Sequence, residues 1–104
     1  MTTPEGIVKK AVKKILDEAG VYYFMPAANG FGRAGIPDII CCVDGTFVAF
    51  ELKAGKGKTT ALQDREIAAI LKNGGYATVI NETNVYKVKE VIEWMQKSST
   101  LLER

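Results

Sequence analysis

The sequence contains no histidine and only two cysteines among its 104 residues. Without histidine, three classes are excluded: serine–histidine hydrolases, metal centres built on imidazole, and enzymes with a histidine general base. The two cysteines, Cys41 and Cys42, are adjacent, so neither a disulfide framework nor a four-cysteine zinc site fits the sequence. Both are expected to be small residues of the hydrophobic core.

The sequence also lacks a long apolar run and an apolar block near its N-terminus. Neither a membrane span nor a secretory signal peptide is therefore expected, and we predict a cytoplasmic protein without membrane association. With 47% hydrophobic and 25% charged residues, the chain has the size and composition of a single domain over residues 1–104.

The net charge of +2 says little, but the basic residues are unevenly distributed. Four lie close together in the first predicted helix and three lie in glycine-containing loops. They are Lys9, Lys10, Lys13 and Lys14 in the helix, and Arg33, Lys56 and Lys58 in the loops. A local basic surface of this kind permits contact with a polyanion. On charge alone, a solvated helix face is the simpler interpretation.

Hydrophobic periodicity and turn signals predict an α-β-β-β-α-β-α order. Thr3–Pro4 is typical of a helix start and Gly20 of a helix end, while Asp44–Gly45 predicts a tight hairpin. Helices are predicted over 4–19, 61–72 and 87–97, and strands over 21–25, 39–43, 46–53 and 76–80. A hairpin followed by a β-α-β crossover indicates an α/β fold with a mixed sheet flanked by helices. Trp94 and Met95, in the last helix, are expected in the core.

Charged residues occupy positions that the pattern assigns to the sheet. Glu51 and Lys53 alternate with apolar residues, so both should point to one face of their strand. Counting from the Asp44–Gly45 turn places Asp38 opposite Glu51 in the hairpin. Two converging carboxylates beside a lysine suit a Mg²⁺ ion held by oxygen ligands, with the lysine positioning or deprotonating a water. An ion pair of Lys53 with either carboxylate is the competing interpretation.

Two further side chains are candidates for the same site. Glu5 lies in the first turn of the first helix, between its apolar stripe and its lysines, and is predicted to point inward as a third carboxylate. A simple interaction with the helix dipole is the alternative for Glu5. Gln63 lies at the start of the next helix and is predicted to lean over the site, although a solvated polar residue would look the same.

These residues resemble, in identity and order, the motifs of the PD-(D/E)xK nuclease superfamily. The matching positions are Gly35-Ile36-Pro37-Asp38, then Glu51-Leu52-Lys53 thirteen residues on, then Gln63 at a helix start. The similarity is greatest to small stand-alone VRR-NUC domains and extends from Glu5 to about Ile80. It implies a restriction-endonuclease-like fold and a divalent-metal-dependent endonuclease that cleaves DNA phosphodiesters with Mg²⁺ or Mn²⁺.

The resemblance also implies roles for individual residues. Asp38, Glu51, Glu5 and the carbonyl of Leu52 correspond to metal ligands, Lys53 to the catalytic lysine and Gln63 to the glutamine of the second helix. The basic residues named above are expected to contact phosphates without reading bases.

Stand-alone VRR-NUC domains are similar to archaeal Holliday-junction resolvases. The resemblance therefore implies a homodimer that acts on branched DNA without a small-molecule cofactor. Three alternatives stay open: a sequence-specific, restriction-like nuclease, an inactive nucleic-acid-binding module, and a structural dimer whose charged strand residues form ion pairs.

Overall fold

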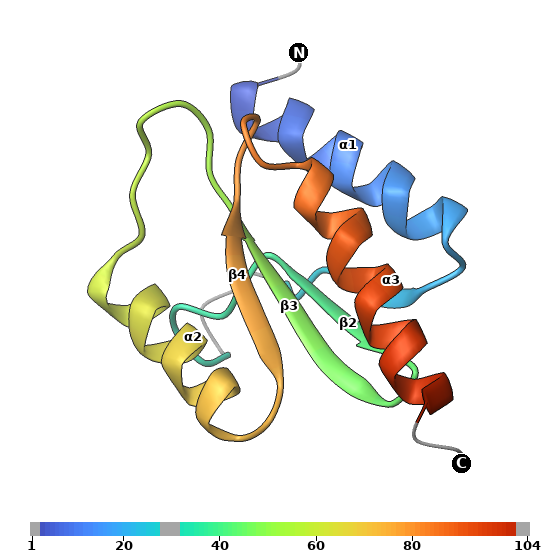
Figure 1. Ribbon diagram of the computed structural model, residues 1–104. Coiled ribbons are helices and arrows are strands. Elements are labelled where there is room, and N and C mark those ends of the chain that lie inside the picture. Colours follow the sequence, from blue (N-terminus) through green and yellow to red (C-terminus); the bar gives the residue numbers. More distant parts are fainter. Residues whose placement is uncertain (1–2, 28–31, 102–104) are drawn as a thin grey trace.

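The computed structural model describes residues 3–27 and 32–101, and the predicted order of helices and strands is confirmed in them (Figure 1). In chain order the elements are α1 (Pro4–Glu18), β1 (Tyr22–Phe24), β2 (Ile39–Val43), β3 (Thr46–Leu52), α2 (Ala61–Lys72), β4 (Tyr76–Ile80) and α3 (Tyr86–Leu101). The first strand is shorter than predicted and the last helix is longer at both ends. No helix within these described ranges is long and apolar enough to cross a membrane.

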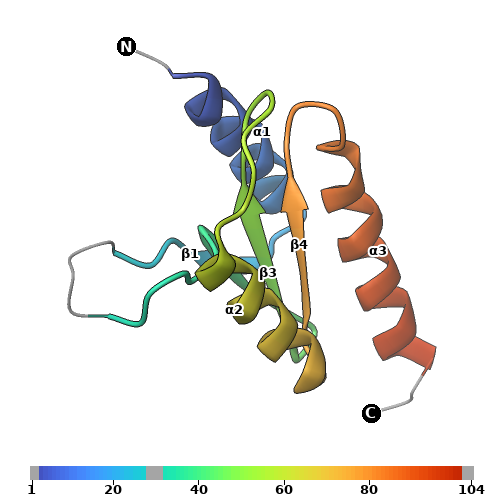
Figure 2. The same ribbon diagram turned by 90° about the vertical axis from the view of Figure 1, so that its left-hand side faces the viewer.

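The four strands form one mixed sheet in the order β1-β2-β3-β4. The first three strands are antiparallel to their neighbours, and β4 runs parallel to β3 because α2 carries the chain back across the sheet. Figures 1 and 2 show α1 and α3 side by side on one face of the sheet and α2 on the other. Within the described ranges, the sheet is therefore covered by two helices on one side and by one on the other.

The β2–β3 hairpin fixes the register on which the predicted site depends. Its two turn residues, Asp44–Gly45, have φ angles of 47° and 87°, as a two-residue hairpin turn of the mirror-image type requires. Ile39 consequently pairs with Phe50. Extending this antiparallel register by one residue places Asp38 beside Glu51, as the sequence predicted.

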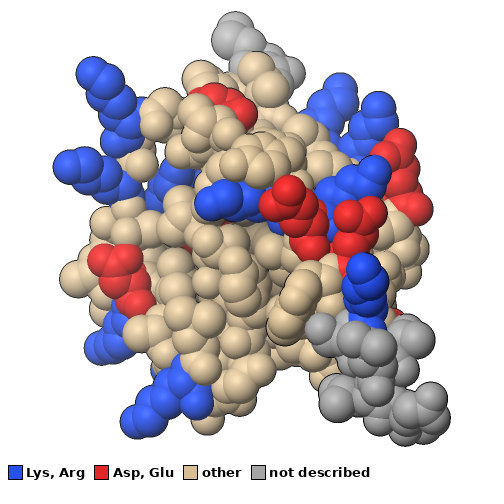
Figure 3. All heavy atoms as spheres, viewed as in Figure 1, with Lys and Arg blue, Asp and Glu red and all other residues tan. Residues whose placement is uncertain are grey.

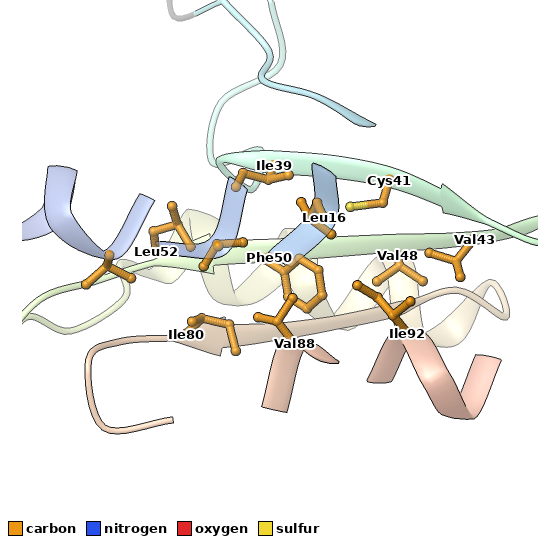
Figure 4. Packing of buried hydrophobic residues seen from close by; sticks show 12 residues of the cluster. Leu16, Ile39, Cys41, Val43, Val48, Phe50, Leu52, Ile80, Val88 and Ile92 are labelled. Atoms are coloured by element: carbon orange, nitrogen blue, oxygen red, sulfur yellow. The ribbon is translucent and has the colours of Figure 1, made fainter. Parts of the chain in front are cut away.

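The larger hydrophobic cluster lies between the sheet and the α1–α3 layer (Figure 4). Phe50 of β3 is fully buried at the centre of this cluster, and Leu16 of α1 and Ile92 of α3 pack against the same face of the sheet. A smaller cluster under α2 contains Ile40 and Ala49. Residues at even positions of β3 therefore face α1 and α3, while its odd positions face the α2 side.

Two predictions about the core are wrong. Trp94 is 63% exposed, whereas its neighbour Met95 packs partly against the core, because α3 turns the flank that carries Trp94 toward solvent. Cys41 is buried, and burial raises the pKa of its thiol to about 12. Cys42 is exposed because it alternates onto the α2 side at a point which α2 does not cover.

Candidate metal and catalytic site

The predicted acidic pair lies at the end of the β2–β3 hairpin that is opposite its turn. Asp38 directly precedes β2, and its Oδ2 accepts a hydrogen bond from the backbone N–H of Leu52 at 2.7 Å. This bond extends the contact between the two strands past the end of β2 and orients the Asp38 carboxylate. Glu51 lies on the same face of the sheet as Asp38, so the two carboxylates converge.

Glu51 is the most constrained side chain of the site, with only 2% of its surface exposed. Its Oε2 accepts a hydrogen bond from Gln63 Nε2 at 3.1 Å and lies 3.4 Å from Lys53 Nζ. Its Oε1 is buried and has no hydrogen-bond partner in the part of the chain that the structure describes. One oxygen of this carboxylate is therefore satisfied and the other is not, which is costly for a buried charge.

The surroundings of Glu51 raise the pKa of its carboxyl from 4.5 to about 7. Burial is the largest cause, the negative charge of Asp38 adds to it, and the positive charge of Lys53 opposes both. Near neutral pH this carboxylate is consequently ready to accept a positive partner, either a proton or a cation.

The first turn of α2 fixes Gln63 in the orientation that reaches Glu51. Thr60 caps the helix by accepting a hydrogen bond from the Gln63 backbone N–H at 3.2 Å, while Gln63 Oε1 accepts from the Thr60 N–H at 2.9 Å. This reciprocal capping box occupies the amide oxygen of Gln63 and leaves its NH₂ group to face Glu51. Gln63 thus lies beside Glu51, where the sequence analysis expected it, and its role at the site stays a prediction.

The segment before Asp38 packs directly against the start of α2. Gly35 has a φ of +82°, and a Cβ built on it would lie only 2.6 Å from the carbonyl oxygen of Leu62. Only a glycine allows this close approach of two backbones. This contact holds the segment that leads to Asp38 against the helix that carries Gln63.

A basic loop, residues 53–60, follows β3 at the same edge of the sheet (Figure 1). Its base is fixed by the Lys53 N–H, which donates to the Ile80 carbonyl at 2.9 Å. Both carboxylate oxygens of Glu82, in the turn after β4, lie 2.9 Å from the Gly55 nitrogen and accept its N–H. Glu82 was not predicted from the sequence, because nothing in the linear pattern places this turn beside the loop.

The prediction that Glu5 points inward is wrong for this structure, since its side chain is exposed. No group of three or more Asp, Glu, Cys or His side chains that could share a metal ion exists among the described residues. Glu5 lies on the same side of α1 as the buried Val12, but one turn before Val8, where the helix extends past the packed layer (Figure 2). The helical wheel gave the correct angle, but not the position at which packing ends.

The predicted phosphate contacts occupy different environments. Figure 3 shows basic side chains over the loop after β3 and over α1, with acidic side chains among those near α1 and α3. Lys9, Lys10 and Lys14 are exposed on α1 and Lys13 is partly buried, while Lys56 and Lys58 are exposed on the loop. The Nε of Arg33 is instead 2.7 Å and 2.8 Å from the two carboxylate oxygens of the buried Glu66. Glu66 was also missed from the sequence.

The donor set at this site fits a hard divalent cation. A buried carboxylate oxygen without a hydrogen-bond partner, Glu51 Oε1, accompanies a second carboxylate on the same face, and oxygen ligands of this kind hold Mg²⁺ or Mn²⁺. The ion pair between Lys53 and Glu51, the competing interpretation from the sequence, is present. It satisfies only Oε2, so an ion pair alone does not account for the whole arrangement.

Comparison with known proteins identifies similar folds. A family model described as "Archaeal holliday junction resolvase (hjc)" matches residues 7–77. A solved "VRR_NUC domain" matches with a TM-score of 0.71 and 26% identity, over 88% of this chain and 97% of the other. A "VRR_NUC domain protein" matches with a TM-score of 0.68 and 20% identity, over 93% and 91%. Hjc of Archaeoglobus fulgidus, a Holliday junction resolvase, matches with a TM-score of 0.54 and 21% identity, over 73% and 64%. No curated protein matches the chain.

Proposed function

The chain belongs to the archaeal Holliday junction resolvase family, and from that premise we propose that it is a divalent-metal-dependent endonuclease that cleaves branched DNA such as Holliday junctions. The resemblance to nucleases with a VRR-NUC domain, inferred from the motif residues, is confirmed at the level of family and fold. The metal, the catalytic roles and the preferred DNA are parts of the proposal.

The buried and unsatisfied oxygen of Glu51 is the observation that carries the proposal. A purely structural strand would gain nothing from burying this carboxylate. Burial raises the pKa of the Glu51 carboxyl to about 7 and leaves its Oε1 without a hydrogen-bond partner among the described residues. A divalent cation at this position would satisfy Oε1 and neutralise the repulsion from Asp38. The energetic cost of the arrangement is thus explained by a ligand.

Asp38, Glu51 and the Leu52 carbonyl would hold the ion, and Mg²⁺ or Mn²⁺ would supply charge stabilisation at the phosphate and a water of lowered pKa. Lys53, whose side chain is 16% exposed and whose Nζ is 3.4 Å from Glu51 Oε2, is positioned to orient or deprotonate the attacking water. Gln63 keeps the Glu51 carboxylate in place by donating to Oε2. In-line attack on the phosphodiester would leave 5′-phosphate and 3′-hydroxyl ends.

The exposed lysines of α1 and of the loop after β3 are proposed to bind DNA phosphates, which positions a duplex without reading its sequence. Arg33 Nε donates to Glu66, so Arg33 would contact a DNA phosphate only through its other guanidinium nitrogens. Glu5 would join the metal ligands only if the exposed end of α1 moves toward the pair when DNA binds.

A cleavage assay tests the proposal. Purified protein is incubated with a four-way junction, a flap and a plain duplex, in Mg²⁺, Mn²⁺ or EDTA, beside the Lys53→Ala variant and a matched Lys97→Ala variant in which an exposed lysine of α3 is removed. We expect metal-dependent cleavage of the branched substrates by the wild type and by Lys97→Ala, and none by Lys53→Ala.

Two results would favour the alternatives. Cleavage of linear duplex at one sequence, with no preference for branches, would indicate a restriction-like nuclease. Salt-sensitive DNA binding without cleavage in either metal would indicate an inactive binding module.

A further inference from the structure

The basic loop that follows β3 and the turn that follows β4 lie at the same edge of the sheet (Figures 1 and 2). The two strands are parallel and pair up to Leu52 and Ile80, after which the Lys53 N–H donates to the Ile80 carbonyl at 2.9 Å. Bonds of a parallel ladder recur every two residues on each chain, so the Gly55 N–H should next meet an acceptor at position 82. An acceptor is present there, but it is the side-chain carboxylate of Glu82, with both oxygens 2.9 Å from the Gly55 nitrogen.

The turn that carries Glu82 is fixed by its own side chains. Asn81 Oδ1 accepts from both the N–H and the hydroxyl of Thr83, at 2.9 Å and 2.6 Å. Asn84 Oδ1 accepts from the Asn81 N–H at 2.7 Å, and Asn84 Nδ2 donates to the Val79 carbonyl at 3.1 Å. Asparagine side chains that bond to nearby backbone groups stabilise a turn in this way. Glu82 therefore projects from a well-fixed support at the end of β4.

The Gly55 N–H belongs to a tight turn within the basic loop. Gly55 has a φ of +57°, which glycine adopts without strain, and the Gly57 N–H donates to the Ala54 carbonyl at 3.0 Å. Lys56 lies at the corner of this turn and is exposed. A contact that fixes the Gly55 N–H consequently fixes the backbone next to Lys56.

Glu82 binds the backbone of the basic loop and not its lysines. Among the described residues, no ion pair joins Glu82 to Lys56 or Lys58. Both lysines are exposed, so their charges stay available to a polyanion. A carboxylate at this edge opposes the approach of a phosphate, and its contribution to the loop is the bond to the Gly55 N–H, which a charged acceptor strengthens.

We propose that Glu82 is a positioning residue for DNA binding, whose carboxylate fixes the basic loop on the end of β4 so that Lys56 contacts a phosphate of the cleaved strand. Lys56 is three residues from Lys53, which limits the separation of their Cα atoms to about 11 Å. One DNA backbone can therefore lie against both residues, with one phosphate at Lys53 beside the acidic pair and a neighbouring phosphate at Lys56. The far end of the loop is fixed separately, by the bond from the Thr59 hydroxyl to Asp64.

The inference rests on the proposed function for its effect on DNA, but the contact itself can be measured without DNA or metal. Two substitutions remove the same charge: Glu82→Gln keeps an oxygen that can accept the Gly55 N–H, and Glu82→Ala removes it. A difference between these variants therefore reports on the hydrogen bond and not on the charge. Glu90→Gln and Glu90→Ala, at an exposed position of α3, are the matched control pair.

Amide exchange of the full chain, measured by NMR in EDTA, tests the contact. The Gly55 amide should exchange with water on the order of 10-fold faster in Glu82→Ala than in the wild type, and Glu82→Gln should keep most of the protection. The control pair at Glu90 should leave the exchange of Gly55 unchanged.

Fluorescence anisotropy of a labelled four-way junction, in EDTA and at one salt concentration, then measures the consequence for DNA. Glu82→Ala should have a Kd about 5-fold higher than Glu82→Gln, whereas the Glu90 pair should agree within about two-fold. In a Lys56→Ala background the difference between the Glu82 variants should fall below about two-fold, because the lysine that the contact positions is gone. In Mg²⁺, kcat at saturating junction should be equal in the two Glu82 variants, since the bond between Lys53 and Ile80 is kept.

Equal Kd values for Glu82→Gln and Glu82→Ala would overturn the proposal, and tighter binding by both than by the wild type would make Glu82 a repelling charge only. Unchanged exchange of Gly55 in Glu82→Ala, or a difference between the variants that persists without Lys56, would also overturn it. If the variants follow the expected order in exchange and binding but the wild type never cleaves, this proposal stands and the nuclease proposal fails, so the two failures are distinguishable.

Discussion

Replacing Glu51 with glutamine should stabilise the metal-free protein while it destroys the proposed metal site. The carboxyl group has a pKa of about 7 in the folded chain against 4.5 in its ordinary state. The folded state therefore holds this proton more tightly, and stability falls as the pH rises from about 4.5 through about 7. At about 1.4 kcal/mol for each pKa unit, this loss approaches roughly 3 kcal/mol above pH 7.

Glutamine has nearly the same shape and cannot ionise, so Glu51→Gln escapes this loss. We expect the variant to be more stable than the wild type by about 1–3 kcal/mol at pH 8, the lower figure allowing for the ion pair that Lys53 loses. At pH 4.5 or below, where the wild-type carboxyl is protonated, the difference should largely disappear. For a domain of this size, the effect at pH 8 corresponds to a rise in Tm of roughly 5–15 °C.

Urea unfolding in EDTA, at pH 4.5 and pH 8 and at one fixed protein concentration, measures the effect. Glu90→Gln is the matched control, because Glu90 is exposed on α3 and should change stability by less than about 0.5 kcal/mol at either pH. Adding Mg²⁺ at pH 8 should stabilise the wild type and leave Glu51→Gln unchanged. A variant that is no more stable than the wild type at pH 8 would refute the reasoning that burial strains this carboxylate.

Three further substitutions test the parts that assemble the site. Gly35→Ala should destabilise the protein by roughly 3 kcal/mol in chemical unfolding, because the added Cβ would meet the backbone of α2. Gly74→Ala is the control: Gly74 also has a positive φ, but a Cβ there would meet no atom, so the cost should be about 1 kcal/mol. Thr60→Ala should cost about 1 kcal/mol in chemical unfolding by removing a helix cap, but should change kcat little, because the backbone N–H of residue 60 still donates to Gln63 Oε1. Glu5→Gln should reduce cleavage less than Glu51→Gln does in the same junction assay, since Glu5 is exposed; equal losses would assign Glu5 to the metal.

The sequence predicted the acidic pair well because its geometry depends on local signals. A two-residue turn at Asp44–Gly45 sets the register of the whole hairpin, and the alternation of side chains then determines which carboxylates meet. No information about distant parts of the chain was needed to place Asp38 beside Glu51. The same reasoning gave the mixed sheet, because a crossover helix requires parallel strands.

Features that depend on where a helix stops covering the sheet could not be predicted from such local signals. Glu5 has the angle of a buried residue on α1, but it lies beyond the point at which the helix is packed. Trp94 lies one position from Met95 on α3, and a rotation of about 100° between them decides which is buried. Cys42 lies on a part of the α2 side of the sheet that α2 does not reach, and a longer helical layer would have covered it.

The capping box of α2 was readable, because the Thr60-Ala61-Leu62-Gln63 segment carries the required threonine and glutamine at the required spacing. The sequence also predicted that Gln63 leans over the site, but not that the cap leaves its NH₂ group to donate to Glu51. That the capped Gln63 directs its NH₂ group at Glu51 depends on how closely α2 approaches the sheet, and Gly35 sets that approach through contacts between residues far apart in the sequence.

The alternation of β3 explains why one strand serves both the core and the site without conflict. Its even positions, including Phe50, fill the core against α1 and α3, while the odd positions run from exposed Phe47 through Ala49 to Glu51. A slip of one residue in the hairpin would place Glu51 in the apolar layer and Phe50 at the site. The buried charge therefore also favours the correct register, because the slipped pairing would bury the Glu51 carboxylate in the apolar layer, away from Gln63.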